Sequence, residues 1–280
     1  MTKAVLNTLS DSKALKAHRG AKKVEEHPAV EPSSTPPPAT LHTAGGASVF
    51  ISPEARAKSQ ELLATPAAAK PVLVFLPGSS GRVSADHKLL LAHLRETFDV
   101  HTLEKGETWG GWAVAKVSSE RNTKAAADLI HRVTGQTQRW FLMAASFGNR
   151  VAAELLSPPS AHLLPGRLPA AVVCVGIPLY AASKSRDANE RTSHFARSFP
   201  AGLRVLLVSG TNDSCLKSKA PEGGPKGEAL LQAQAARWAC GELTQVYMVP
   251  GGGHGALDGS AKPPAVHAAE EAMRAFMLQQ

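Results

Sequence analysis

Cysteine is scarce in this chain, with three residues among 280, and its scarcity excludes two ways of holding a fold together. Cys174, Cys215 and Cys240 are too few and too scattered for a disulfide framework or for a zinc-ligating motif. The sequence therefore predicts a protein of a reducing compartment, the cytoplasm or the nucleus.

Long apolar runs are also missing from the sequence. No stretch approaches the roughly 20 uninterrupted apolar residues that a membrane span needs, so none is predicted. The N-terminus lacks the apolar core of a secretory signal. An apolar fraction of 43% and a mean hydropathy of -0.12 instead fit a soluble globular protein with a sizeable buried core.

The net charge of +8 raises the question of a nucleic-acid partner. Residues 1–45 hold six Lys/Arg and four Asp/Glu, a net charge of +2, so the other +6 is spread over the remainder. No run of basic residues is interleaved with aromatics, and aromatics make up only 5% of the chain. The sequence therefore predicts no dedicated nucleic-acid site.

The chain divides into two parts by composition. Residues 1–45 are basic at their start and rich in Pro, Ser, Thr, Ala and Gly at their end, a composition that buries little apolar surface. We predict a disordered tail there, either a solvated basic segment or an organelle-targeting peptide. Residues 46–280 are predicted to form one folded domain.

Within residues 46–280, short apolar runs alternate with longer stretches of helical periodicity. The predicted strands cover residues 72–76, 98–103, 139–145, 170–179, 203–209 and 244–249. The predicted helices cover residues 89–98, 118–133, 147–156, 227–240 and 264–278. This alternation predicts an α/β fold, a mainly parallel sheet with helices on both faces. The short link between Gly176 and Leu203 indicates that no large cap domain is inserted there.

The segment Ala144-Ala145-Ser146-Phe147-Gly148 lies between a predicted strand and a predicted helix. It matches the nucleophile elbow Gly-x-Ser-x-Gly, with alanine at the first position. Small residues are required two before and two after the serine, because strand and helix pack closely there. The alternative interpretation is that Ser146 only caps the helix.

Two further turns at predicted strand ends carry an acid and a base. Asp213 follows the strand in "VSGTND", and His254 lies in the glycine-rich loop "PGGGHG" after the last strand. Taken singly, each fits a plain turn residue or a surface histidine. Together with Ser146 they occur in the order nucleophile, acid, base, which is the chain order of α/β hydrolases. We therefore predict a catalytic triad.

Other residues complete this predicted site. "LPGSSG" follows the first core strand, so the amides of Gly78 or Ser79, with that of Phe147, are the expected oxyanion-hole donors. Trp109 and Trp112 in "KGETWGGWAV" could form an apolar wall for the substrate, or could simply pack against a helix. No metal-ligand cluster or phosphate-binding loop is present in the sequence, so no metal and no cofactor is predicted.

From about residue 70 to 278 the chain resembles the α/β-hydrolase domain shared by the third subunit of the NSL histone-acetyltransferase complex and a related testis-expressed protein, a family similar to dienelactone hydrolases. The resemblance is carried by "FLPGSSG", "MAASFGNRVAAEL", "VVCVGIPLY" and "VSGTNDSC". It departs from the family where Pro77 replaces a histidine, where Ala144 and Ala145 replace Gly-Arg, and where Phe147 replaces a methionine. Proline has no amide to donate, which affects the oxyanion loop.

The resemblance implies Ser146 as nucleophile, Asp213 as acid and His254 as base, with Gly78, Ser79 and Phe147 around the oxyanion. The expected function is that of a serine hydrolase acting on a small ester, thioester or lactone through an acyl-enzyme. Because some members of the family serve as complex subunits, the alternative is a non-catalytic interaction module with a protein-complex partner.

Overall fold

The structure of the chain is a computed structural model. It describes residues 40–43, 48–50, 69–103, 119–134, 139–179, 195, 199–217, 225–258 and 261–279. Among the helices in these ranges, none combines the length and the apolar composition needed to cross a bilayer.

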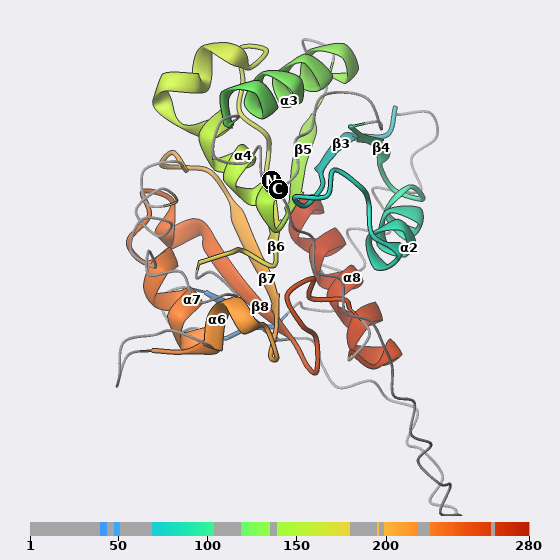
Figure 1. Ribbon diagram of the computed structural model, residues 1–280, viewed down its shortest axis with the longest axis vertical. Coiled ribbons are helices and arrows are strands. Elements are labelled where there is room, and N and C mark those ends of the chain that lie inside the picture. The colour runs from blue at the N-terminus through green and yellow to red at the C-terminus, as the bar shows by residue number, and fades with distance from the viewer. Residues whose placement is uncertain are drawn as a thin grey trace, which may run out of the picture. The chain divides into compact units, whose positions relative to one another are not determined.

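A parallel sheet forms the centre of the described chain (Figure 1). Its parallel strands are β3 (Val72–Leu76), β4 (Asp99–Thr102), β5 (Trp140–Ala145), β6 (Val172–Val175), β7 (Val205–Gly210) and β8 (Thr244–Val249). They lie in the order β8-β7-β6-β5-β3-β4. The α-helices that connect or follow these strands are α2 (Ala85–Leu94), α3 (Ser119–Val133), α4 (Phe147–Leu156), α6 (Ser214–Lys217), α7 (Gly227–Ala235) and α8 (Pro263–Leu278). The predicted α/β architecture is confirmed.

Two short strands extend the sheet beyond β8. Strand β1 (Thr40–Thr43) pairs antiparallel with β8 and with β2 (Ser48–Phe50). Strand β1 falls inside residues 1–45, which the sequence analysis assigned to a disordered tail. The sheet therefore begins before the predicted boundary at residue 46, because pairing with β8 orders a segment whose own composition gives no strand signal.

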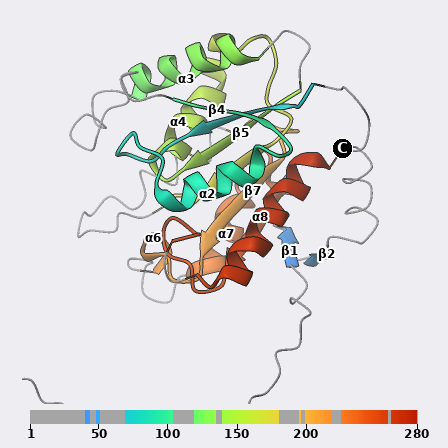
Figure 2. The ribbon, with the colours of Figure 1, turned by 90° about the vertical axis from the view of Figure 1, so that its right-hand side faces the viewer.

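Alternating side chains of each strand pack into two separate layers. On β3, Val72, Val74 and Leu76 join the cluster that contains residues of α3, α4 and α7. Leu73 and Phe75 join the opposite cluster, with residues of α2 and α8. Figure 2 shows α2 and α8 side by side on their face of the sheet. Both faces of β3, β5, β6 and β7 are thus buried, which explains the continuous apolar runs of these strands.

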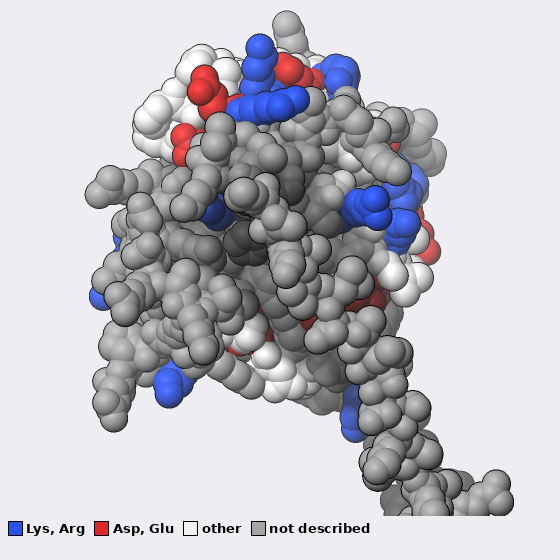
Figure 3. All heavy atoms as spheres, in the orientation of Figure 1, with Lys and Arg blue, Asp and Glu red and all other residues white. Residues whose placement is uncertain are grey.

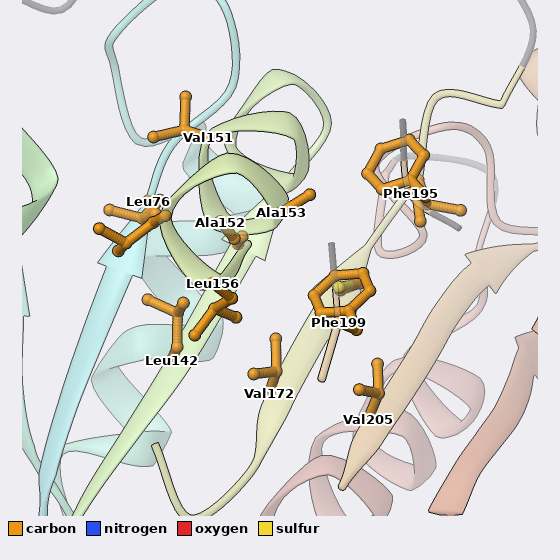
Figure 4. Packing of buried hydrophobic residues seen from close by; sticks show 14 of the residues in the cluster. Leu76, Leu142, Val151, Ala152, Ala153, Leu156, Val172, Phe195, Phe199 and Val205 are labelled. Atoms are coloured by element: carbon orange, nitrogen blue, oxygen red, sulfur yellow. The ribbon is translucent and has the colours of Figure 1, made fainter. Parts of the chain in front are cut away.

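The layer around α4 positions the start of that helix. Val151, Ala152 and Leu156 of α4 lie over Leu76 and Leu142 (Figure 4). Each of these side chains is at most 1% exposed. Tight apolar contact along the whole helix holds its N-terminal turn at the carboxyl end of β5.

The aromatic part of the same layer explains where α7 ends. Helix α7 stops at Ala235, although the periodicity predicts a helix to residue 240. Beyond its end, the Trp238 ring lies 5.1 Å from the Phe199 ring and 6.2 Å from the Phe195 ring. Burial of this indole therefore ends the helix, so tertiary packing overrides helical propensity here.

The connections of the sheet reverse direction between β3 and β5. From β3 the chain passes through α2 to β4 on one side, and then through α3 to β5 on the other side of β3. In open parallel sheets, ligands bind beyond the carboxyl ends of the strands at such a switch point. The turns after β3 and β5 are those that hold Gly78 and Ser146.

Charge on the described part of the face drawn in Figure 3 does not gather in one place. In Figure 3, the described Lys and Arg side chains of this face lie singly or in small groups near its margins, and acidic side chains lie among those at the top. On the part of this face that the structure describes, basic residues form no continuous patch.

Candidate active site

The side chains of Ser146, His254 and Asp213 meet at the carboxyl ends of β5, β8 and β7. Ser146 Oγ lies 2.9 Å from His254 Nε2. His254 Nδ1 lies 3.1 Å from Asp213 Oδ1 and 3.2 Å from Oδ2. Residues separated by up to 108 positions in the sequence thus form one hydrogen-bonded chain. Ser146 and His254 are half-buried, whereas Asp213 is fully buried.

The backbone of Ser146 is held in an unusual conformation. Its φ is +49° and its ψ is -113°, a region that non-glycine residues rarely occupy and that costs about 1–3 kcal/mol. The residue stands at the N-cap position of α4, yet its side chain makes no capping hydrogen bond. Its hydroxyl contacts His254 instead. The interpretation of Ser146 as an ordinary helix cap is therefore wrong.

Close packing between α4 and the end of β3 explains the glycine two residues after Ser146. A Cβ atom on Gly148 would overlap the carbonyl oxygen of Leu76 and lie 2.7 Å from that of Pro77. Both obstacles are backbone atoms, which cannot rotate away. Two residues before Ser146, Ala144 is fully buried within β5. Its small side chain meets the requirement for close packing on that side of the serine.

We predict that Gly148→Ala lowers the free energy of unfolding by about 3 kcal/mol, because the added methyl group meets rigid backbone. Chemical denaturation of both proteins measures the difference. Gly78→Ala is the matched control, since a Cβ there would make ordinary contacts of 3.7 and 3.8 Å. Equal stability of Gly148→Ala and the unmodified protein would contradict the observed packing.

The carboxylate of Asp213 is oriented by two further hydrogen bonds. Ser209 Oγ donates to Oδ2 over 2.7 Å, and the Cys215 amide donates to Oδ1 over 2.7 Å. An ionised carboxylate can only accept hydrogen bonds, so His254 Nδ1 must be the donor to it. In the neutral imidazole, the lone pair of Nε2 then faces Ser146.

The loop that carries His254 is fixed by backbone contacts on two sides. The Asn212 amide donates to the Gly252 carbonyl over 2.8 Å, and the Gly251 amide donates to Thr211 Oγ1 over 2.9 Å. The carboxylate of Asp258 accepts from the amides of Gly253 and Gly255, the two neighbours of His254. These bonds hold the imidazole over the end of β7.

Glycine at position 176 makes room for this loop. Gly176 has a φ of +57°, and a Cβ there would overlap the carbonyl oxygen of His254. The backbone after β6 therefore passes directly beneath the histidine. A larger residue at position 176 would displace His254 from Ser146.

Electrostatics at His254 favour the protonated ring. Burial alone would lower the pKa of His254, but its hydrogen bonds to Asp213 and Cys215 and their electrostatic attraction for the protonated ring outweigh burial and raise the pKa to about 10. Below that pH the imidazolium is the stable form. The arrangement therefore stabilises a proton on His254. A histidine that accepts the hydroxyl proton of Ser146 has to be stable in this protonated form.

The structure brings the predicted oxyanion residues to the same place. A Cβ on Gly78 would lie 3.7 Å from Ser146 Cβ, so this residue adjoins the serine. Ser79 follows it and is half-buried, and Phe147 opens α4 directly after Ser146. Trp109 and Trp112, predicted to line a substrate wall, lie outside the described residues.

Two residues at this site were not found from the sequence. Ser209 is the next-to-last residue of β7 and looks like any strand residue, so nothing marked its contact with Asp213. Asp258 follows His254 by four positions in a glycine-rich loop, where a carboxylate commonly captures backbone amides. An aspartate in a glycine-rich loop could therefore have indicated this contact from the sequence.

A thiol adjoins the base. Cys215 Sγ lies 4.0 Å from His254 Nε2, the same nitrogen that contacts Ser146. Asp213, Cys215 and His254 each offer a possible metal-ligand atom, and these atoms lie within 4.8 Å of one another. The sequence spacing had indicated no such cluster.

Comparison with known proteins identifies the fold. No family model and no curated protein matches the sequence. The solved structure of DcsB with its substrate analogue is 12% identical, with a TM-score of 0.52, and the match covers 75% of this chain and 90% of DcsB. A soluble variant of monoglyceride lipase from Saccharomyces cerevisiae, solved with a substrate analogue, is 9% identical, with a TM-score of 0.52 and coverage of 75% and 86%. With its parallel sheet, flanking helices and these likenesses, the chain has the α/β-hydrolase fold.

Proposed function

We propose that the protein is a serine hydrolase that cleaves a small ester, thioester or lactone. The observation that carries this proposal is the continuous hydrogen-bonded chain from Ser146 through His254 to Asp213. A hydroxyl, an imidazole and a buried carboxylate in that order are the parts from which acyl-transfer enzymes build an activated nucleophile.

In the proposed reaction, Ser146 Oγ attacks the carbonyl carbon of the substrate. His254 Nε2 removes the hydroxyl proton as the new C–O bond forms, and Asp213 stabilises the resulting imidazolium. His254 then gives this proton to the leaving alcohol or thiol, and an acyl group remains on Ser146. A water molecule, deprotonated by the same nitrogen, attacks the acyl-enzyme and restores the serine.

The negative charge that develops on the carbonyl oxygen needs hydrogen-bond donors beside Ser146. We assign this role to the amide of Phe147 and to the amide of Gly78 or Ser79. The position of Phe147 at the N-terminus of α4 supports the assignment, because a helix N-terminus favours negative charge. The short separation between Gly78 and Ser146 supports it as well.

The likeness to solved structures supports a hydrolase through the fold they share. The yeast neighbour is a monoglyceride lipase, and both neighbours were solved with substrate analogues. Membership in the NSL-subunit and testis-expressed family is part of the same proposal and is carried by the motifs around Ser146. A non-catalytic interaction module with a protein-complex partner is the alternative that this family resemblance implies.

Hydrolysis of p-nitrophenyl esters of increasing acyl length by the full chain tests the proposal. We expect turnover above the rate of the Ser146→Ala protein, with a preference among acyl lengths that reports the size of the acyl pocket. A folded protein that hydrolyses no member of the series, and no thioester or lactone, would favour the non-catalytic interaction module.

We predict that kcat/KM rises with pH across the neutral range. His254 must be deprotonated to accept the Ser146 proton, and its raised pKa of about 10 leaves only a small neutral fraction at pH 7. Each added pH unit should therefore increase kcat/KM about tenfold until the pKa is approached.

The pH profile is measured with a p-nitrophenyl ester, and the rate of the Ser146→Ala protein is subtracted at each pH to remove alkaline hydrolysis. A profile that is already flat from pH 7 to pH 9 would contradict the raised pKa of His254.

A further inference from the structure

A buried amide side chain lies on α4, three residues after Ser146. Asn149 is fully buried, and its Nδ2 atom donates a hydrogen bond to the Val175 carbonyl over 2.9 Å. Its Oδ1 atom is also buried and has no hydrogen-bond partner in the part of the chain that the structure describes. A buried acceptor without a partner destabilises a fold, so stability alone would favour an apolar residue at this position.

The hydrogen bonds of Asn149 enclose the backbone of Ser146. The Val175 carbonyl also accepts from the Ser146 amide over 2.9 Å, and the Asn149 amide donates to the Ser146 carbonyl over 3.0 Å. Both backbone polar groups of Ser146 are therefore bonded either to Asn149 or to the carbonyl that its side chain binds. Strained backbone, such as that of Ser146 with its φ of +49°, persists only where surrounding contacts hold it.

The carbonyl at the end of β6 lies directly before the glycine that makes room for the histidine loop. Val175 ends β6, and a Cβ on the next residue, Gly176, would overlap the carbonyl oxygen of His254. The Gly176 amide donates to the Val208 carbonyl over 2.8 Å, which fixes the other side of this peptide. The peptide between Val175 and Gly176 thus adjoins both the turn of Ser146 and the loop of His254, and its placement affects their separation.

We propose that Asn149 is a positioning residue for hydrolysis, whose side chain holds the strained backbone of Ser146 against the end of β6. This placement keeps Ser146 Oγ within hydrogen-bonding distance of His254 Nε2. The side chain of Asn149 is fully buried and therefore acts through the nucleophile, without touching the substrate. This role rests on the proposed hydrolase function. The stability lost by burying Oδ1 is then a consequence of the role, a common relation between stability and activity.

Two substitutions in the full chain separate the hydrogen bond of Asn149 from its volume. Asn149→Ala and Asn149→Leu both remove the donor, whereas leucine keeps a branched side chain with as many heavy atoms as asparagine. We expect both to lower kcat for the fastest p-nitrophenyl ester by about 10- to 100-fold, because small displacements of a reacting group are costly. KM should change by less than about twofold, since no contact with the substrate is lost. The rate of fluorophosphonate labelling at Ser146 should fall with kcat, while the denaturation midpoint of Asn149→Leu stays at or above that of the unmodified protein.

Thr134→Ala is the matched control for a lost buried hydrogen bond. Thr134 is buried directly after α3, and its hydroxyl donates to the Ile130 carbonyl over 2.7 Å. It precedes β5, whose other end leads to Ser146. We expect this substitution to lower the denaturation midpoint and to keep kcat.

The outcomes distinguish the role of Asn149 from the proposed function. If the unmodified protein hydrolyses esters and both Asn149 variants match its kcat, or Asn149→Leu alone recovers it, the positioning role is overturned and the hydrolase stands. A loss of kcat in Thr134→Ala equal to that in Asn149→Ala would also overturn the role. A folded, unmodified protein with neither turnover nor labelling at Ser146 would overturn the proposed function, and this role with it.

Discussion

Ser146→Ala is expected to lower kcat/KM for p-nitrophenyl esters by at least about 10³-fold, and to leave the fold unchanged. The substitution removes the oxygen that would bond to the acyl group, so no other side chain can supply the covalent step. The residue left in the elbow is no larger than serine, and the buried contacts of α4 stay in place. Steady-state kinetics with the fastest ester of the series measures the loss.

Ser157→Ala is the control for this prediction. Ser157 lies at the other end of the same helix, where its hydroxyl donates to the Glu154 carbonyl over 2.6 Å. It carries the same hydroxyl group as Ser146 but is distant from His254 along α4. We expect it to keep nearly full activity, and an equal loss in both proteins would assign the effect to α4 rather than to the nucleophile.

Asp213→Asn is expected to lower kcat by about 10³- to 10⁴-fold when both proteins are compared on the plateaus of their pH profiles, the scale known for this exchange in serine proteases. An amide can present its NH₂ group to His254 Nδ1, which then becomes the acceptor and turns an N–H toward Ser146. The base is lost although every atom stays near its position. Ser209 Oγ and the Cys215 amide also lose a charged acceptor.

The explanation by a changed tautomer of His254 also predicts a shift in the pH profile of the rate. Without the carboxylate, the pKa of His254 falls, because Asp213 is its main source of stabilising charge. The rate of Asp213→Asn should therefore reach its plateau at a lower pH than that of the unmodified protein. Asp99→Asn is the matched control: Asp99 also contacts a histidine, His101 over 3.0 Å, but on β4 at the far edge of the sheet.

Local chemistry in the sequence was sufficient for the elements around the site. Helix α4 and strand β8 have the predicted bounds 147–156 and 244–249, because each apolar run is interrupted by serine, glycine or proline. The turns that follow the strands hold Ser146, Asp213 and His254 as predicted. The distances between these three side chains could not be predicted from the sequence, because they depend on strand order and on the loop after β8.

The features that sequence analysis missed all arise from contacts between distant segments. Strand β1 is ordered by pairing with β8, α7 is shortened by the burial of Trp238 against Phe199, and Ser209 contacts Asp213 only because β7 ends in a tight turn. In none of these segments does the hydrophobic periodicity indicate the distant residue that it contacts. The close approach of Cys215 to His254 is of the same kind.

Labelling with a fluorophosphonate, followed by mass spectrometry of the digested protein, tests the central claim most directly. The reagent bonds to a serine only when a neighbouring base activates its hydroxyl. The account predicts one adduct on the peptide that contains Ser146, and none there in Ser146→Ala. A folded, unmodified protein that stays unlabelled at Ser146, even at alkaline pH where His254 is neutral, would contradict it.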